Sequence, residues 1–234
     1  MIRWAAITLL LLSAWFCSPR SEQFAQTPPT QEAASVGECE NTSKVIGFGV
    51  VSFDEKTVLP FFADSDASKQ PVQVVRFYHE PAINSLSFRV EGKGSYSLLR
   101  PEGHKLDYSI FDLPVRSKRD GWLEVLADQE SGKTLWVRED QTVRFADWLS
   151  KMQGAFAVAR VDRAGNPLRA EPAGTGNEVK ITGRDCFKVS EMRGDWIRVV
   201  QQDICNGRSS SRGSGWVRWR DTQGCLLMEI FPFA

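Results

Sequence analysis

The chain has 234 residues, of which 42% are hydrophobic and 25% are charged, as expected for a globular protein with one large domain or two small ones. Basic and acidic side chains are equal in number, 29 of each, so the formal net charge is zero. A chain without excess charge creates no broad electrostatic field. We therefore expect neither nucleic acid nor an anionic membrane surface as a partner.

The N-terminus has the pattern of an export signal. A positive start that includes Arg3 is followed by an apolar run over residues 4–16. The run is shorter than the roughly 20 residues that cross a bilayer, but it matches the hydrophobic region of a signal peptide. Residues 1–17 are therefore predicted to be a signal segment, and the protein to be extracytoplasmic, either periplasmic or secreted. Cys17 resembles the lipidated cysteine of bacterial lipoproteins, but bulky Phe16 precedes it, so a lipid anchor is the weaker alternative.

Residues 18–44 are rich in Pro, Ser, Thr, Gln and Ala and poor in large apolar side chains. Such a segment buries too little apolar surface to offset the entropy lost on ordering, and it is predicted to be a disordered tether.

Four cysteines remain when the signal segment is excluded: Cys39, Cys186, Cys205 and Cys225. In an exported protein they can form lasting disulfides, with three possible connectivities. Since three of the four lie near the C-terminus, we expect Cys205 to pair with Cys186 or with Cys225. A zinc site is the alternative, but the chain has no C-x-x-C spacing, and no metal site is predicted.

Short apolar or alternating runs separated by Gly, Pro and Asp recur from residue 45 onward. Their length and their content of Val, Phe, Tyr and Trp favour strands over helices. The predicted strands are 45–53, 72–78, 85–90, 96–99, 108–113, 122–126, 134–137, 155–161, 178–181, 186–190, 196–200 and 215–219. The apolar stretch 225–233 is expected to cover the second sheet.

Helical spacing is confined to residues 141–154, where large apolar side chains recur and Gly154 can end a helix. The sequence therefore predicts a mainly β protein. A β domain at 45–140 is followed by a helical linker at 141–154 and a second β domain at 155–234.

One pattern is used twice. Residues 113–126 align without a gap with residues 187–200, so that Trp122 meets Trp196, and Trp136 and Trp216 then correspond downstream. Each copy enters a polar Gly/Asp turn and returns as a Trp-led alternating strand, which is typical of a β-hairpin. Upstream, residues 99–102 resemble residues 168–171.

This pattern resembles bacterial SH3-like domains, in which a Leu-Arg segment precedes a hairpin ending in Gly-Trp-x-x-Val and then Gly-Trp-Val. The second copy carries it as Leu168-Arg-Ala-Glu-Pro-Ala-Gly174, Gly194-Asp-Trp-Ile-Arg-Val199 and Gly215-Trp-Val217. The first copy has Leu135 where glycine is expected. The resemblance covers about half of the chain behind the signal and implies two small SH3-like β-barrels, the first of them degenerate.

The copies differ most in the loop between their tryptophans, which is long only at residues 201–214. Recognition is commonly found on such loops, and Arg208 and Arg212 can meet a carboxylate or phosphate. With Trp196 and Trp216, whose rings can face either the core or a ligand, they form the predicted ligand-binding set. A solvated loop held by a disulfide at Cys205 is the structural alternative.

The chain lacks the usual marks of an enzyme. Its two histidines, His79 and His104, adjoin no nucleophile motif, and no phosphate loop or metalloprotease motif is present. We expect no catalytic residues and no cofactor.

The prediction is a non-catalytic binding or adaptor protein for a peptide, peptidoglycan or an envelope protein, with contact to a membrane only through the signal segment or a lipid on Cys17. A structural envelope protein is the first alternative, and a cell-wall hydrolase with an unrecognised site is the second.

Overall fold

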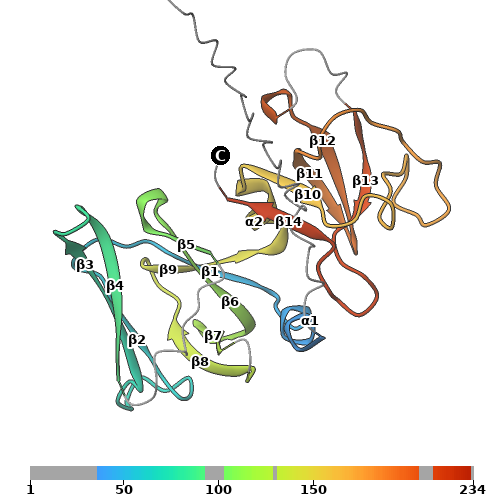
Figure 1. The fold of residues 1–234 in the computed structure, drawn as a ribbon. Helices are drawn as coiled ribbons and strands as arrows, with labels where there is room; N and C mark the ends of the chain where they lie inside the picture. Colours follow the sequence, from blue (N-terminus) through green and yellow to red (C-terminus); the bar gives the residue numbers. More distant parts are fainter. Residues whose placement is uncertain (1–35, 93–102, 129–130, 206–212, 233–234) are drawn as a thin grey trace, which may run out of the picture. The chain divides into compact units, whose positions relative to one another are not determined.

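The computed structural model describes residues 36–92, 103–128, 131–205 and 213–232 (Figure 1). The predicted signal segment lies outside these ranges. The described chain is mainly β, as predicted, but its strands form three sheets, and none of the three closes into a barrel.

The first sheet has six strands. Five follow the order β8-β7-β6-β1-β9, and β5 pairs with β6. The strands are β1 (Gly47–Val51), β5 (Gly103–Lys105), β6 (Ile110–Arg119), β7 (Trp122–Asp128), β8 (Lys133–Arg138) and β9 (Val143–Asp147).

The second sheet has five strands in the order β13-β12-β11-β10-β14. They are β10 (Ala157–Arg160), β11 (Phe187–Arg193), β12 (Trp196–Gln201), β13 (Ser214–Arg218) and β14 (Met228–Phe231). The five-strand order of the first sheet is thus repeated element by element. We call the two sheets with their connections the first and the second repeat.

The repeats agree in register as well as in strand order. In each, the hairpin closes with an arginine paired to the leading tryptophan, Arg119 with Trp122 and Arg193 with Trp196. The first strand of each hairpin, β6 or β11, also has a bulge just after its aligned valine, Val115 or Val189. Bulges bend a strand and increase its twist, so the shared position gives both sheets a bend at the same place.

The hairpin turns differ as their sequences require. Asp120 and Gly121 both have positive φ, 47° and 73°, whereas in the second repeat Gly194 has φ 57° and Asp195 does not have positive φ. Two positive φ values are characteristic of a type I′ turn, and a positive φ at the first central residue alone of a type II′ turn. Asp-Gly and Gly-Asp are the matching sequences.

The first repeat contains an insertion that the second lacks. A third sheet, in the order β2-β3-β4, lies between β1 and β5 in the chain and consists of β2 (Val58–Phe61), β3 (Gln73–Glu80) and β4 (Ser85–Gly92). Its inward residues Phe61, Val75 and Phe77 join the core of the first sheet. The sequence predicted β3 and β4 but missed β2.

Most of the other predicted strands are confirmed, with two exceptions. Residues 96–99 lie outside the described ranges. Residues 178–181 form no strand, and Glu178 makes only an isolated bridge with Arg169. The predicted upstream match is separate from these strands: residues 99–102 lie outside the described ranges, and the described first-repeat residue that occupies the place of Arg169 is Phe62. Phe62 bridges Trp136 as Arg169 bridges Trp216.

The prediction of a helical linker over residues 141–154 is partly wrong. Helix α2 is Trp148–Gly154, while Val143–Asp147 is strand β9, which pairs with β1 along its whole length. Asp147 caps α2 by accepting a hydrogen bond from the Ser150 backbone at 2.7 Å. Helix α2 packs against the hydrophobic core of the second sheet. Val45 and Phe48 of the first repeat pack there too, so residues from both repeats share this core.

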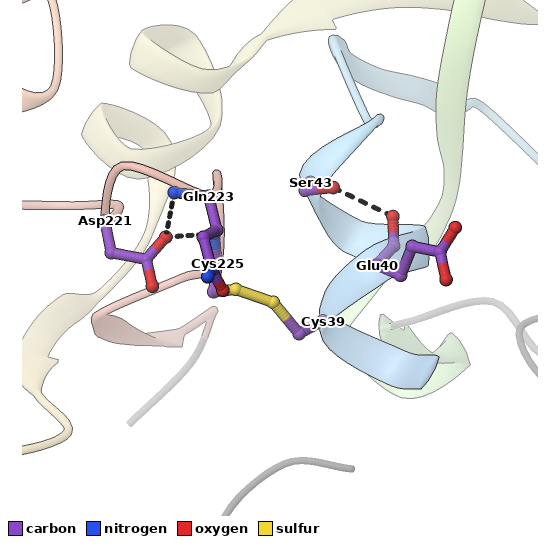
Figure 2. The surroundings of a disulfide bond; sticks show 6 residues. All are labelled: Cys39, Glu40, Ser43, Asp221, Gln223 and Cys225. Atoms are coloured by element: carbon purple, nitrogen blue, oxygen red, sulfur yellow. Dashed lines mark hydrogen bonds between the residues drawn. A yellow bond between two sulfur atoms is a disulfide. The ribbon is translucent and has the colours of Figure 1, made fainter. Parts of the chain in front are cut away.

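The predicted tether and one of the two predicted pairings of Cys205 are also corrected. Helix α1 (Val36–Ser43) occupies the end of the tether, and its Cys39 forms a disulfide with Cys225, with the two Cα atoms 5.1 Å apart (Figure 2). A Cys205–Cys225 bond is therefore wrong. Cys186 is disulfide-bonded too. The remaining short helical turns are η1 (Leu106–Tyr108) and η2 (Asp203–Cys205).

Candidate ligand-binding face

Two of the residues predicted to bind a ligand, Trp196 and Trp216, lie on one face of the second sheet. Successive side chains of a strand point to opposite faces. In β12, Ile197 and Val199 are buried in the core, while Trp196 and exposed Arg198 point outward. Cross-strand pairing sets Trp196 opposite Arg218 and Arg198 opposite Trp216. We call Arg193, Trp196, Arg198, Trp216 and Arg218 the second outer face.

Arginines stack on both tryptophans of this face. The guanidinium carbon of Arg218 lies 5.4 Å from the centre of the Trp196 ring, and that of Arg193 lies 4.9 Å from the Trp216 ring. Such cation–π contacts contribute about 0.5–1 kcal/mol at exposed sites. Trp216 is only 6% exposed, so its ring mainly supports the sheet. Trp196 is half-buried and leaves part of its ring accessible.

The charge of the second outer face is only partly neutralised. Arg193 forms an ion pair with Glu191 at 2.6 Å. Within the described part of the chain, neither Arg198 nor Arg218 has a carboxylate partner. Two guanidinium groups beside an accessible indole can bind a planar anion such as a carboxylate through paired hydrogen bonds.

The first repeat has the same stacking of arginine on tryptophan, but its tryptophan rings are covered. Arg138 lies 5.4 Å from the Trp122 ring and Arg119 lies 4.5 Å from the Trp136 ring. The ring of Phe62 packs edge-on against Trp122 at 5.3 Å, and the three aromatic residues form a buried cluster. We call Arg119, Trp122, Glu124, Trp136 and Arg138 the first outer face.

The residue opposite Trp136 also differs in charge. Where the second repeat has Arg198, the first has Glu124, which accepts hydrogen bonds from Ser117 at 2.7 Å and Thr134 at 2.8 Å. Both carboxylate oxygens of Glu124 are therefore used within the sheet. The first outer face therefore has no open ring, and Glu124 adds a negative charge to it where the second outer face has Arg198.

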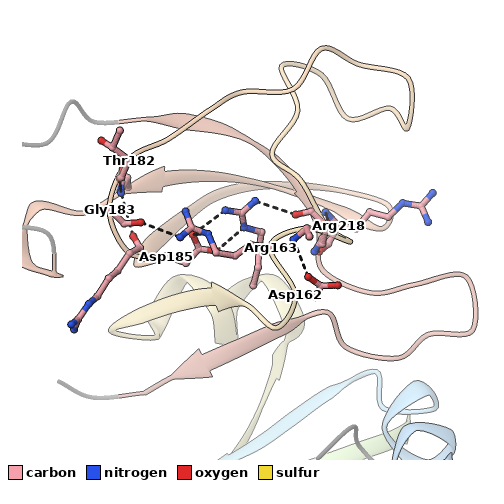
Figure 3. A network of polar contacts seen from close by, with 11 residues as sticks. Asp162, Arg163, Thr182, Gly183, Asp185 and Arg218 are labelled. Atoms are coloured by element: carbon pink, nitrogen blue, oxygen red, sulfur yellow. Dashed lines mark hydrogen bonds and ion pairs between the residues drawn. The ribbon is translucent and has the colours of Figure 1, made fainter. Parts of the chain in front are cut away.

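A polar network fixes the long connection between β10 and β11 beside the second outer face (Figure 3). Arg160 is 8% exposed and makes two hydrogen bonds to the Asp185 carboxylate, at 2.6 and 2.9 Å. Arg163 contacts the same carboxylate at 3.1 Å and donates to the Gly183 carbonyl at 3.2 Å. Because one carboxylate holds two arginines, the two ends of the connection stay together.

Asn166 couples this network to the second outer face. It is 5% exposed, donates to the Arg218 carbonyl at 2.8 Å and accepts from the Arg218 backbone N–H at 3.2 Å. The side chain thus pairs with the edge of β13 as a neighbouring strand would. Sequence reasoning missed Arg160, Asn166 and Asp185, and the Asn166-Pro167 pair is only a general turn signal.

The other predicted functional residues are not part of this face. Arg208 and Arg212 lie outside the described residues, in the connection between β12 and β13. His79 is on β3, and His104 on β5 packs edge-on against Phe88 at 5.6 Å.

No group of three or more potential metal ligands occurs among the described residues. Of the helices that the structure describes, none has the length and apolar character needed to cross a membrane.

Comparisons with known proteins return nothing for this chain: no family model, no curated protein and no solved structure matches it.

Proposed function

We propose that the chain is a non-catalytic, extracytoplasmic binding or adaptor protein built from two SH3-like modules, of which the second carries the ligand site. The observation that supports this most directly is the unequal covering of one duplicated face. In the first repeat the Phe62 ring packs against the Trp122 ring. In the second repeat Arg169 occupies the position of Phe62, and its guanidinium donates a hydrogen bond to the Gly176 carbonyl at 2.8 Å. Trp196 is left accessible.

The chemistry of the second outer face favours a peptide with free carboxylates. Arg198 and Arg218 supply charge-assisted donors, and the Trp196 ring on the same face supplies a flat apolar surface. Short cell-wall stem peptides and acidic segments of envelope proteins have this chemistry. The Cys39–Cys225 disulfide supports an oxidising location.

The test compares two matched charge reversals. Arg218→Glu removes a cation from the open face, and Arg138→Glu makes the same change at the equivalent position of the covered face, where the guanidinium also lies 5.4 Å from its tryptophan. Binding is measured by co-sedimentation with purified peptidoglycan and by titration calorimetry with acidic peptides. We expect Arg218→Glu to lower the affinity about tenfold or more, and Arg138→Glu to leave it unchanged.

A folded wild-type protein that binds neither peptidoglycan nor acidic peptides would contradict the proposal. Equal losses for the two variants would also contradict it, since the second outer face would then have no special role. Circular dichroism confirms that both variants are folded.

A structural envelope protein is the second candidate. Its support is a set of large apolar side chains on the surface, among them Ile46 at 46%, Val161 at 44% and Phe231 at 41% exposure. Light scattering that shows a stable assembly of the chain without any ligand would favour this function.

A further inference from the structure

A small chamber separate from the second outer face has apolar walls and a charged floor. Phe48 of β1, Trp148 of α2, and Met228 and Ile230 of β14 line it, together with Asp112 and Lys151, and its volume is about 280 Å³. Pockets that bind drug-sized molecules are roughly 300–1,000 Å³. The chamber therefore suits a ligand of about the size of one amino acid.

The floor of the chamber is an ion pair between the Lys151 ammonium and the Asp112 carboxylate. The Lys151 side chain is 18% exposed and that of Asp112 is 7% exposed. Removing two charges from water is costly, and an apolar pair of similar volume is often as stable or more stable. The repeated fold does not require the pair, because the residue of the second repeat that aligns with Asp112 is Cys186.

Both members of the pair have unused hydrogen-bonding capacity. A lysine ammonium carries three donors, and a carboxylate oxygen accepts more than one hydrogen bond. Among the described residues, Lys151 donates only to Asp112 Oδ2 and lies 5.4 Å from the Phe48 ring, and Asp112 Oδ1 receives no side-chain hydrogen bond. The Trp148 indole N–H is already satisfied by the Val45 carbonyl at 2.8 Å. The polar groups that remain for a ligand are one cation and one anion.

We propose that this chamber binds a free α-amino acid with an apolar side chain. The ligand ammonium donates to Asp112 Oδ1, the ligand carboxylate accepts from Lys151, and the side chain packs on Met228 and Ile230. In a bound zwitterion each charge of the ligand therefore lies next to the opposite charge of Asp112 or Lys151. A simple carboxylate would face Asp112 unpaired, and a simple amine would face Lys151 unpaired, so each lacks one of the two favourable contacts.

The experiment titrates the full-length chain with leucine, methionine and phenylalanine by calorimetry. 4-Methylpentanoate and isoamylamine serve as probes that each keep only one of the two charges, and glutamate and lysine serve as zwitterions with charged side chains. We expect saturable binding of the apolar amino acids alone. Asp112→Asn and Lys151→Met each lower the affinity for leucine about tenfold or more.

Two further variants protect the test from folding defects. Lys188→Met removes a lysine that donates to the Ala155 carbonyl and does not line the chamber, and it should leave leucine binding unchanged. Ile230→Trp fills the chamber while keeping the ion pair, and it should abolish binding.

Equal binding of leucine and 4-methylpentanoate would overturn the proposal, as would leucine binding that survives both Asp112→Asn and Ile230→Trp, or no binding of any apolar amino acid to the folded chain. Because this site is independent of the second outer face, Arg218→Glu should not affect it.

Discussion

In the first repeat Phe62 packs against Trp122, which is 4% exposed, whereas in the second repeat the residue at the same place is Arg169 and the matching Trp196 is only half-buried. The two sheets otherwise share their strand order, their hairpin register, the position of their bulge and the stacking of arginine on tryptophan. The two repeats therefore share one scaffold and differ in how far the leading tryptophan of the hairpin is covered.

This difference in covering originates in the connection that follows β1 in the first repeat and β10 in the second. In the first repeat that connection contains the sheet β2-β3-β4, whose Phe61 and Val75 extend the core. In the second repeat the connection is held by the polar network of Arg160, Asp185 and Asn166. An apolar insertion adds buried surface at the expense of an accessible face, while a hydrogen-bonded loop leaves that face free.

The largest expected effect concerns the bond that joins the repeats. The Cys39–Cys225 disulfide spans a sequence separation of 186 residues and links the helix before the first repeat to a loop of the second. Closing so long a loop removes entropy from the unfolded chain, so the double variant Cys39→Ser/Cys225→Ser should lose about 3–5 kcal/mol of unfolding free energy. Urea unfolding measures the loss.

Substitution is preferable to a reductant here, because Cys186 is also disulfide-bonded. A loss below about 1 kcal/mol, well under the usual cost of a native disulfide, would mean that each repeat is stable without the link.

The next largest effect is expected where the sheets differ by one core side chain. Leu135 is 3% exposed and belongs to the first core, whereas Gly215 stands at its place in the second repeat. Leu135→Gly should cost about 3–5 kcal/mol, because it leaves a cavity and adds backbone freedom to the unfolded chain.

The reverse change tests the same pair of positions. A Cβ atom on Gly215 would lie 3.0 Å from the Arg169 carbonyl oxygen and 3.1 Å from Leu168 Cδ2, so Gly215→Leu should overpack the site and cost about 1–3 kcal/mol. If denaturant unfolding showed either substitution to be neutral, the two positions would be interchangeable.

The duplicated hairpins were predictable because their information is local. Turn residues followed by alternating Trp-led strands specify a hairpin within a dozen residues, and the structure confirms the gapless match of Trp122 with Trp196. Strand β9 was missed because Val143 and Phe145 continue the apolar spacing of helix α2. Only pairing with β1, almost a hundred residues earlier in the sequence, makes them a strand.

The covering of the outer face depends on contacts that no local pattern carries. Phe62 reads as one apolar residue in an irregular segment, and its role becomes visible only when its backbone pairs with Trp136. The predicted Cys205–Cys225 alternative failed for the same reason, since proximity in sequence favoured Cys205 while the fold brings Cys39 to Cys225. The predicted tryptophans were found on one face, but the arginines that give it charge, Arg198 and Arg218, were not singled out.

Exchanging the residues at the equivalent positions 62 and 169 tests directly whether they control the exposure of the tryptophan rings. Phe62→Arg places a charge against Trp122 and Trp136 and should cost about 3–5 kcal/mol, as for loss of a buried aromatic ring. Acrylamide should then quench the tryptophan fluorescence more strongly.

Arg169→Phe is the reciprocal change and should have a smaller effect on stability. It removes the hydrogen bond to the Gly176 carbonyl, worth about 0.5–1.5 kcal/mol, and should lower the quenching by covering Trp196. Unchanged quenching in both variants would show that this position does not control access to the rings.

An effect of similar size is expected at helix α2, which has no counterpart among the described residues of the second repeat. Asp147→Ala removes the cap and should cost about 1 kcal/mol at neutral pH. The hydrogen bond from the Ser150 backbone N–H holds the pKa of Asp147 below its ordinary value of 3.8. A lowered pKa stabilises the folded chain above pH 3.8, and this contribution is lost as the pH falls through the folded-state pKa.

The difference in unfolding free energy between wild type and Asp147→Ala should therefore shrink as urea titrations are moved from neutral to acidic pH. Asp147→Asn keeps an acceptor for the Ser150 N–H but has no charge to lose, so its difference from Asp147→Ala should be independent of pH in this range. A wild-type difference that stays constant down to the acid limit of folding would mean that the charge of Asp147 adds nothing to the cap, and that its oxygen alone starts the helix between the repeats.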